Sequence, residues 1–255
     1  MDKINNERQW HNEFYKGGAT PEESVRSFIL PAYVALEYPR FVFKKLQLVS
    51  SIKVLDIGCG RGLERANSFI LNNCSYTGID ISEECINANI NDATMKGINA
   101  TFIVEDANTM SSLKGQKFDL IILTGTLHHL ELDQALSVMK ELTDDVTGKV
   151  IMLEPMGTNP LINLFRKLTP KLRSPDEHPL TFKDLDLIRN YFPGTKYELH
   201  TLTALFTIPI GMIPLRLTKR LTRSMSLYLG RLDKLLGKVP FLNRFSWNVI
   251  IEAKP

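Results

Sequence analysis

Three aspartates and a glycine-rich loop are the residues of this chain whose types and spacing could bind a nucleotide-like ligand. The segment VLDIGCGRG carries Asp56 at the end of an apolar run, followed by Gly58, Gly60 and Gly62. Glycine permits a tight turn and lets a ligand lie against the backbone, and a helix after the loop offers free N–H groups. The GxGxG spacing differs from the GxGxxG of dinucleotide-binding loops. Because an anion at Asp56 would repel a pyrophosphate and attract an amine, the segment predicts a ligand with positive charge near the loop.

The other two aspartates end the next two predicted strands. GID places Asp80 where a carboxylate can accept hydrogen bonds from both hydroxyls of a ribose. VEDA places Asp106 where a carboxylate and the adjacent backbone can meet the exocyclic amine of an adenine. Taken singly, the glycines are equally explained as turn residues and the aspartates as helix caps. Taken together, a ribose, an adenine and a cationic amino-acid tail describe S-adenosylmethionine.

Alternating strands and helices must position these residues. Apolar strands are predicted at 52–57, 75–80, 101–106, 118–124 and 149–155, and helices between them at 63–72, 82–97 and 132–143. Continuous apolar strands that alternate with helices indicate a parallel sheet covered on both faces. Further helices are predicted at 5–16, 21–46, 180–192 and 215–236, and further strands around 196–206 and 246–253.

The motifs VLDIGCGRG, GID, VEDA, FDLIILTGTLHHL and VIMLEP, in this order, resemble those of the class I S-adenosylmethionine-dependent methyltransferases. The resemblance implies an α/β, Rossmann-like fold with a seven-stranded, mostly parallel sheet, helices on both faces and an antiparallel last strand, SWNVIIEA. It divides the chain into a helical N-terminal cap at 1–50, a cofactor-binding core at 51–155, and substrate-side helices with the final strands at 156–255. The cofactor contacts that follow from it are Asp56, Gly58, Cys59, Gly60, Asp80, Ile81, Asp106, Ala107 and Thr124.

Two adjacent histidines are the first candidates for catalysis. If the methyl acceptor is a hydroxyl, a side chain must take its proton, and the near-neutral pKa of histidine suits that role. GTLHHL brings His128 and His129 to the carboxyl edge of the sheet, where ligands bind. Glu154, at the end of the fifth strand, is the next candidate and His178 the third. Ordinary packing of the loop explains the two histidines equally well.

The expected activity is that of an S-adenosylmethionine-dependent methyltransferase (EC 2.1.1.-) acting on a small molecule. The first expectation for the acceptor is a hydroxyl of a sugar, a lipid-linked glycan or a related metabolite. The alternatives are C-methylation of a quinone-like or polyketide ring and a catalytically silent module that only binds the cofactor. The chain lacks the Asn/Asp-Pro-Pro-aromatic motif of amino-methylating enzymes at GTLHHL, which argues against a nucleic-acid or protein target. Candidates to line the acceptor pocket are Trp10, His11, Phe14 and Tyr15; the alternative is that they dock their helix onto the domain by hydrophobic contacts.

Composition excludes several classes of protein. The three cysteines, Cys59, Cys74 and Cys85, form no CxxC pair, so neither a disulfide framework nor a metal site is predicted. The opening residues MDKINNERQW lack the apolar core of a signal peptide, and no apolar run is long enough to cross a membrane. We therefore expect a cytoplasmic location; the oligomeric state is not predicted.

The basic residues of the chain gather in its last part. Residues 156–255 have a basic excess and residues 1–155 an acidic one, which the net charge of +3 hides. Within 215–238, an apolar stripe at helical spacing faces a basic side, a pattern that could lie on an anionic membrane at its inner face. The alternative is a helix packed over the sheet with its basic side in solvent. Nucleic acid is not expected, because the basic side has no interleaved aromatic residues for base stacking.

Overall fold

The computed structural model describes residues 3–16, 51–71, 73–168, 177–203, 206–207 and 216–255. The helix predicted at 21–46 lies outside these residues. The three-part division of the chain at 50 and 155 therefore stays a prediction.

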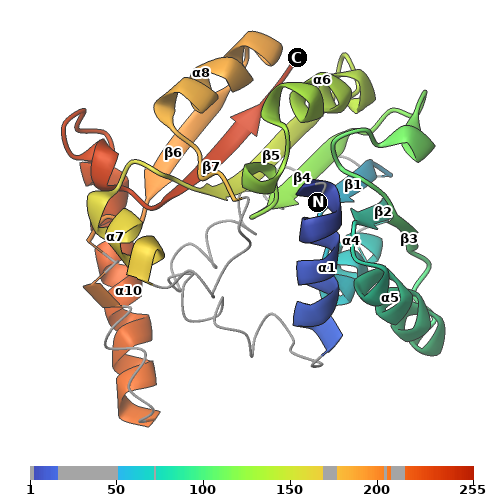
Figure 1. Cartoon of the computed structure of the whole chain (residues 1–255), viewed down its shortest axis with the longest axis horizontal. Coiled ribbons are helices and arrows are strands. Elements are labelled where there is room, and N and C mark those ends of the chain that lie inside the picture. The colour runs from blue at the N-terminus through green and yellow to red at the C-terminus, as the bar shows by residue number, and fades with distance from the viewer. Residues whose placement is uncertain (1–2, 17–50, 72, 169–176, 204–205, 208–215) are drawn as a thin grey trace.

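A seven-stranded sheet runs through the described part of the chain (Figure 1). Its strands are β1 (Lys53–Ile57), β2 (Ser75–Asp80), β3 (Thr101–Val104), β4 (Leu120–Thr124), β5 (Lys149–Pro155), β6 (Lys196–His200) and β7 (Asn248–Ala253). The strand order is β3-β2-β1-β4-β5-β7-β6. Strands β1 to β5 pair in parallel, and β7 lies antiparallel to both β5 and β6. The predicted fold class, including an antiparallel last strand, is confirmed.

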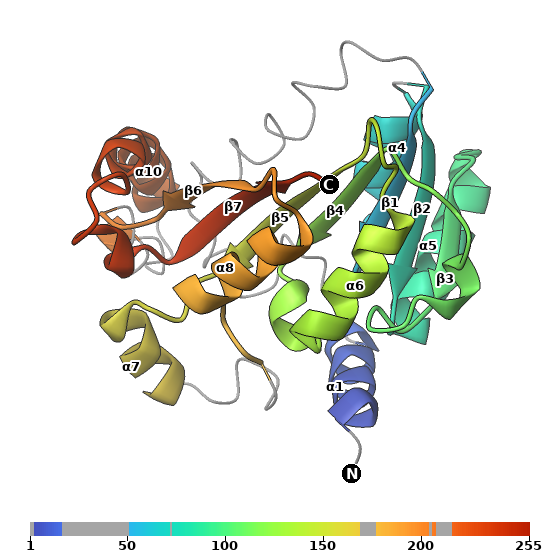
Figure 2. The same cartoon turned by 90° about the horizontal axis from the view of Figure 1, so that it is seen from above.

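Helices cover both faces of this sheet. The α-helices are α1 (Lys3–Lys16), α4 (Leu63–Ile70), α5 (Glu83–Lys96), α6 (Leu132–Leu142), α7 (Pro160–Leu168), α8 (Phe182–Tyr191) and α10 (Arg216–Leu236). Short 3₁₀ turns are η2 (Ser111–Leu113), η3 (Leu127–His129) and η6 (Asn243–Phe245). Seen from above, α6 and α8 lie on one face and α4 on the other (Figure 2).

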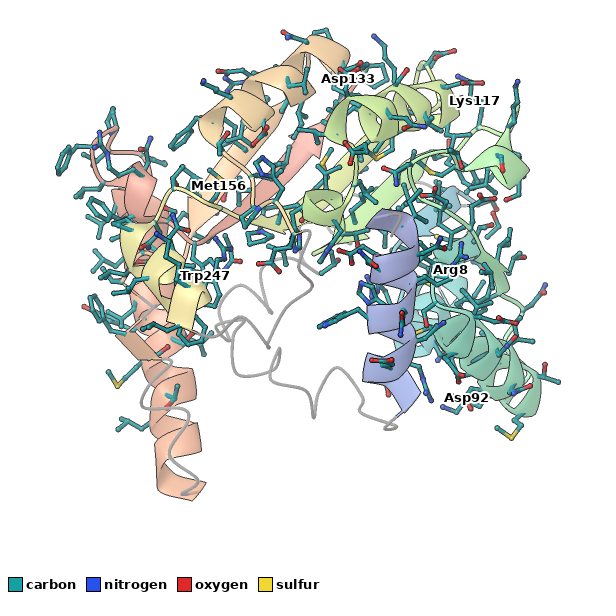
Figure 3. All side chains as sticks on the ribbon, viewed as in Figure 1. Arg8, Asp92, Lys117, Asp133, Met156 and Trp247 are labelled. Carbon is teal, nitrogen blue, oxygen red and sulfur yellow. The ribbon has the colours of Figure 1, made fainter. Side chains whose placement is uncertain are left out.

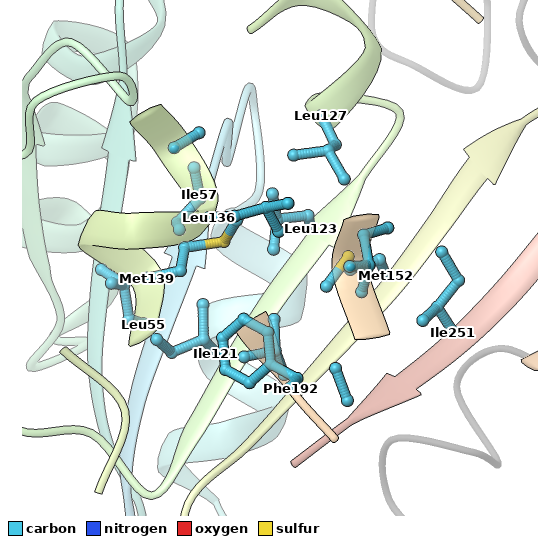
Figure 4. Close-up of a cluster of buried hydrophobic side chains, with 14 of the residues drawn as sticks. Leu55, Ile57, Ile121, Leu123, Leu127, Leu136, Met139, Met152, Phe192 and Ile251 are labelled. Carbon is cyan, nitrogen blue, oxygen red and sulfur yellow. The ribbon is translucent and has the colours of Figure 1, made fainter. Parts of the chain in front are cut away.

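Alternate residues of the central strands enter two hydrophobic clusters. Leu55 and Ile57 of β1 pack with residues of α6 and α8 in the cluster of Figure 4. Val54, the residue before Leu55, packs with residues of α4 and α5 on the opposite face. Because successive side chains of a strand point to opposite faces, each strand serves both clusters. This is why the strands appear in the sequence as continuous apolar runs.

Two local features define the helix α5, which follows the strand that ends at Asp80. The Ser82 side chain accepts a hydrogen bond from Cys85 N at 3.3 Å, and Gly97 ends the helix in the left-handed region at φ 64°. The two residues are the bounds of the helix predicted at 82–97, and both bounds are confirmed. The Ser82 side chain accepts a hydrogen bond from a backbone N–H group that has no partner within the helix. Gly97 takes the left-handed conformation in which its own N–H donates to carbonyl oxygens of the last turn.

The part of the chain after β5 differs from the expectation in two places. Helix α7 was not predicted, although Asn159 Oδ1 accepts a hydrogen bond from Leu161 N at 2.9 Å and Pro160 occupies the first turn. The strand predicted at 196–206 ends at His200, because Thr201 takes a positive φ of 63°. Nearby, the loop after β5 meets the start of β7 where Met156 N donates to Trp247 O at 2.6 Å (Figure 3).

Helix α10 extends beyond the sheet in Figure 1. Much of the predicted apolar stripe is exposed where its side chains are described: Leu221 at 52%, Tyr228 at 72% and Leu235 at 64%. These three side chains therefore do not pack over the sheet, although α10 itself contacts β6. Among the described helices, none combines the length and the apolar character that a membrane span requires.

Candidate functional site

A cavity of about 210 Å³ lies at the carboxyl ends of β1 to β4, with α1 forming one of its walls. The loops after the parallel strands supply the other walls, as expected for an open α/β sheet. Its lining consists of Ile4, Glu7, His11, Gly58, Asp80, Ile81, Asp106, Ala107, Asn108, Thr124, Gly125, Thr126, His129, Leu130 and Glu131. The lining includes six of the nine predicted cofactor contacts: Gly58, Asp80, Ile81, Asp106, Ala107 and Thr124.

The glycine at the start of the loop is required by both its conformation and its surroundings. Gly58 has a φ of +67°, in the left-handed region that side chains rarely adopt. A Cβ atom at this position would lie 2.2 Å from the Thr126 Oγ1 atom. The loop after β1 therefore approaches the loop after β4 closely, because the Thr126 side chain occupies the space that a side chain at position 58 would need.

Asp80 holds the glycine loop and faces the cavity. One of its carboxylate oxygens accepts a hydrogen bond from Gly60 N at 2.8 Å, and the other accepts one from Ser82 N at 2.9 Å. A carboxylate has further lone pairs, so these bonds leave acceptor capacity toward the cavity. The side chain can thus shape the loop and still receive ligand hydroxyls.

Asp56, Cys59 and Gly60 lie outside the lining of the cavity. Asp56 is fully buried; it accepts a hydrogen bond from Tyr76 Oη at 2.5 Å and lies 3.3 Å from Arg65 Nε. Burial raises the pKa of Asp56, and the Arg65 guanidinium and the Tyr76 hydroxyl act in the opposite direction. A cationic partner for Asp56 is therefore present within the chain itself. Direct cofactor contacts by these three residues stay predictions.

Asn108 is a lining residue that the sequence analysis missed. Its backbone N–H and its Nδ2 both donate to Asp106 Oδ1 at 2.9 Å, and its Oδ1 accepts a hydrogen bond from Glu131 N at 2.7 Å. These bonds tie the loop after β3 to the start of α6 and hold the Asp106 carboxylate. Its position two residues after Asp106, the aspartate that ends the predicted strand, is the sequence feature that could have identified it.

Glu154 organises the turn that carries the two histidines. It is fully buried at the end of β5, and one of its oxygens accepts hydrogen bonds from Thr126 N at 3.0 Å and Leu127 N at 2.9 Å. Its other oxygen lies 2.7 Å from His128 Nδ1. Burial raises the pKa of Glu154 to about 7, although the backbone N–H groups oppose the shift. Neither Glu154 nor His128 lines the cavity.

His129 is the histidine that lines the cavity, beside two groups from α1. Its Nδ1 lies 3.4 Å from Glu7 Oε2, and the same oxygen lies 3.5 Å from His11 Nε2. Burial, with a smaller contribution from His128, lowers the pKa of His129 to about 4, and Glu7 acts in the opposite direction. The imidazole is therefore neutral at pH 7.

The predicted acceptor-pocket residues and His178 have different positions. His11 lines the cavity and Trp10 does not, while the side chains of Phe14 and Tyr15 lie outside the described part of the structure. The His178 side chain is 70% exposed, and only its backbone N–H reaches the site, donating to His128 O at 2.6 Å. Sequence reasoning missed Glu7, one turn before His11 on α1.

Comparison with known proteins identifies the kind of domain. Residues 48–173 match the family model described as "Methyltransferase domain". Among curated proteins no match was found.

Solved structures share the fold at low identity. Magnesium protoporphyrin IX methyltransferase from Synechocystis PCC 6803 with bound SAH has a TM-score of 0.58 at 15% identity, covering 100% of both chains. A SAM dependent methyltransferase from Archaeoglobus fulgidus has a TM-score of 0.56 at 19% identity, covering 91% of this chain and 97% of that one. The [4+2]-cyclase SpnF has a TM-score of 0.55 at 16% identity, covering 84% of this chain and 79% of that one.

Proposed function

Because the chain belongs, over residues 48–173, to the class I S-adenosylmethionine-dependent methyltransferases, we propose that it methylates a hydroxyl of a small-molecule acceptor. The observation that carries this proposal is one cavity with two chemically different sides. Gly58, Asp80 and Asp106 are lining residues from the ends of parallel strands, which we assign to the first side, and Glu7 and His129 are lining residues from α1 and η3, which we assign to the second. Such a cavity can hold a cofactor against one wall and an acceptor against the other.

The residues of the first side fit S-adenosylmethionine. Asp80 keeps acceptor capacity for the ribose hydroxyls, and Asp106 with Asn108 offers a carboxylate and backbone groups for the adenine. Gly58, with its φ of +67°, lets the loop take the turn in which a ligand can lie against the backbone. The cofactor supplies a methyl group on a sulfonium centre, and the protein must align the acceptor and exclude water.

We assign the removal of the acceptor proton to the second side of the cavity. His129 lines the cavity with an unprotonated imidazole. Burial lowers its pKa and so its strength as a base, but the neighbouring Glu7 carboxylate opposes this shift and would stabilise the imidazolium that forms when the acceptor proton is taken. Glu154 and His128 have no place in the lining. Both are therefore proposed as positioning residues, which hold the turn η3 and with it His129.

A turnover screen tests this function. Purified protein, methyl-labelled S-adenosylmethionine and fractionated metabolite pools should yield the demethylated cofactor and a labelled product, whose methyl group NMR places on oxygen. A methyl group on carbon would favour the alternative of C-methylation of a quinone-like or polyketide ring. A protein that binds no cofactor in calorimetry would contradict the whole proposal.

A second candidate function is a cofactor-binding protein without methyl transfer. The observation behind it is the shared fold of the [4+2]-cyclase SpnF, whose name describes a different reaction. Cofactor binding that persists while every acceptor fraction stays unlabelled would favour this candidate. Loss of labelling in His129→Ala, with cofactor affinity unchanged, would exclude it.

A surface at the other end of the sheet supports binding to a membrane, and a membrane position would suit a lipid-linked acceptor. Both views place α7 and α10 at the β6–β7 end of the sheet, away from α1 (Figures 1 and 2). Exposed large apolar side chains of this end include Leu161, Leu164 and Leu168 of α7, Tyr228 and Leu235 of α10, and Phe241. Exposed apolar side chains in such number mark an interaction surface.

The charge of the same segment favours an anionic partner. Eight basic residues lie between positions 216 and 246: Arg216, Lys219, Arg220, Arg223, Arg231, Lys234, Lys238 and Arg244. The one acidic residue of this stretch, Asp233, is buried and accepts hydrogen bonds from Leu202 N at 2.9 Å and Thr203 N at 2.6 Å. Apolar side chains with basic neighbours suit the surface of an anionic bilayer. We propose a peripheral position on the inner face of the membrane.

Flotation with liposomes tests the membrane proposal. The protein should float with vesicles that contain phosphatidylglycerol, and high salt should reduce the bound fraction. Tyr228→Glu and Leu235→Glu should lower it, whereas Val146→Glu, at a 92% exposed valine in the loop before β5, should not. Protein that stays wholly in the bottom fraction would contradict the proposal without touching the methyl transfer.

A further inference from the structure

Three side chains on the acceptor side of the cavity have the chemistry of metal ligands. They are Glu7 and His11 of α1 and His129 of η3. One donor atom from each lies within 4.8 Å of the other two. All three residues line the cavity, so a cation between them would face whatever the cavity holds.

Two elements bring these ligands together. Glu7 and His11 are four residues apart, a spacing that places both side chains on one face of the helix. Helix α1 is held beside the end of β2 because Ser82 Oγ donates to Asn12 Oδ1 at 2.7 Å. His129 comes from the turn that Glu154 organises. The cluster therefore stands on two anchored elements.

The distances within the cluster fit a metal site. Glu7 Oε2 lies 3.5 Å from His11 Nε2 and 3.4 Å from His129 Nδ1. A tetrahedral site with metal–ligand bonds of about 2.1 Å has ligand-to-ligand edges of about 3.4 Å. Both measured distances fall at that edge length.

We infer that Glu7, His11 and His129 bind one divalent transition-metal cation, Zn²⁺ by preference, with its open position toward the cavity. Two imidazoles and one carboxylate are a ligand set of catalytic zinc sites, which use three protein ligands and keep the fourth position free. A second cluster, His128, His129 and Glu177, shares His129. It is the weaker candidate, because His128 Nδ1 is already 2.7 Å from Glu154 and neither His128 nor Glu177 lines the cavity.

The role of the cation rests on the proposed function. A hydroxyl bound at the open position loses its proton more readily, because the cation lowers the pKa of bound oxygen acids. The proton passes to solvent water, and the oxygen forms the new C–O bond as the C–S bond of the sulfonium breaks with its electron pair on sulfur. In this arrangement His129 is a metal ligand and not the base. No strong base is needed, because the cation makes the bound hydroxyl lose its proton more readily.

Metal binding by the tag-free, chelator-treated full chain is the test. Titration with Zn²⁺ should show one equivalent bound, and Co²⁺ should give the visible absorption of a tetrahedral site. Glu7→Gln and His129→Ala should each weaken binding more than about tenfold, since even residues behind the ligands change metal affinity by about 10 to 100-fold. The controls are His178→Ala, at a largely exposed histidine, and Glu177→Gln, which removes the competing cluster. Both controls should bind as the natural chain does.

The outcomes separate the inference from the proposed function. A chain that binds S-adenosylmethionine but no Zn²⁺ or Co²⁺ overturns the inference and leaves His129 as the base. Equal metal binding in Glu7→Gln and in the natural chain, or its loss in Glu177→Gln, overturns it as well. Binding of the cofactor is measured in every variant as the check that the variant is folded. If His129→Ala no longer binds the cofactor, the metal affinity of Glu7→Gln alone tests the inference. Intact metal binding without methyl transfer to any acceptor would count against the proposed function alone.

Discussion

At the scale of single residues, one carboxylate joins the glycine loop to the cavity. Asp80 accepts hydrogen bonds from Gly60 N and Ser82 N and also lines the cavity. Its replacement therefore has two effects, a loosened loop and a lost acceptor for ligand hydroxyls. Asp56, which looks equivalent in the sequence, is instead engaged with Tyr76 and Arg65 in the interior.

Asp80→Asn should weaken the binding of S-adenosylmethionine and of its demethylated product by about 10 to 100-fold, because hydrogen bonds to charged groups contribute about 1.5–3 kcal/mol. Isothermal titration calorimetry measures the dissociation constants. Asp145→Asn is the matched control, since the Asp145 side chain is 80% exposed on a distant loop. Equal affinity in Asp80→Asn and the natural chain would contradict the ribose assignment.

Glu154 makes stability depend on pH. Burial raises its pKa from 4.5 to about 7 in the folded chain, so the folded state holds a proton that the unfolded state has released between these values. The free energy of unfolding should then fall as pH rises from about 4.5 to 7, by on the order of 3 kcal/mol in total from this group. Glu154→Gln should flatten this slope in denaturant titrations at several pH values. Parallel slopes in the two proteins would show that Glu154 has the same pKa in the folded and unfolded states.

At the scale of elements, the contact between α1 and the start of α5 decides how the cavity is closed. Ser82 Oγ accepts the Cys85 N–H as a helix cap and donates to Asn12 Oδ1 of α1. One side chain thus stabilises a core helix and holds the wall that carries Glu7 and His11. The two contributions can be separated because Asn12 takes part in only the second of these bonds.

Asn12→Ala should weaken cofactor binding and speed proteolysis within α1, with little change in the unfolding of the core. Ser82→Ala should do the same and also lower the free energy of unfolding by about 1 kcal/mol through the lost cap. Limited proteolysis and denaturant unfolding measure the two effects. Gln9→Ala, on the exposed side of α1, is the control. The assignment of α1 as a wall of the site fails if Asn12→Ala and Gln9→Ala behave alike.

At the scale of the whole molecule, the cavity is built by loops from four parallel strands and by α1, so a ligand there joins separate parts of the chain. The demethylated cofactor at about 100 times its dissociation constant should add about 2.7 kcal/mol to the stability of the folded state. For a domain of this size that corresponds to a rise of roughly 5 to 10 °C in melting temperature. Differential scanning calorimetry measures the shift. Asp80→Asn at the same ligand concentration should shift less, and no shift in the natural chain would contradict a cofactor site in this cavity.

Much of this fold follows from local sequence. The apolar runs of β1 to β5 predict a doubly covered parallel sheet because buried strands need apolar side chains on both faces. Ser82 and Gly97 predict the ends of α5 because capping depends on a few neighbouring residues. Helix α7 was missed although Asn159 and Pro160 carry the same kind of signal. The end of β6 could not be predicted in this way: Asp233, far along the chain, binds Leu202 N and Thr203 N just past Thr201.

The sequence by itself determined the cofactor class, the glycine loop and the carboxylates that end successive strands, because parallel strands bring their carboxyl ends to one edge whatever the packing. Only the tertiary structure decided which of these residues face the cavity. It turned His129 toward the cavity and His128 toward Glu154, and it brought Glu7 and His11 across to meet His129. It also left the apolar stripe of α10 largely exposed. Each of these depends on contacts between residues far apart in the chain, which periodicity and spacing do not encode.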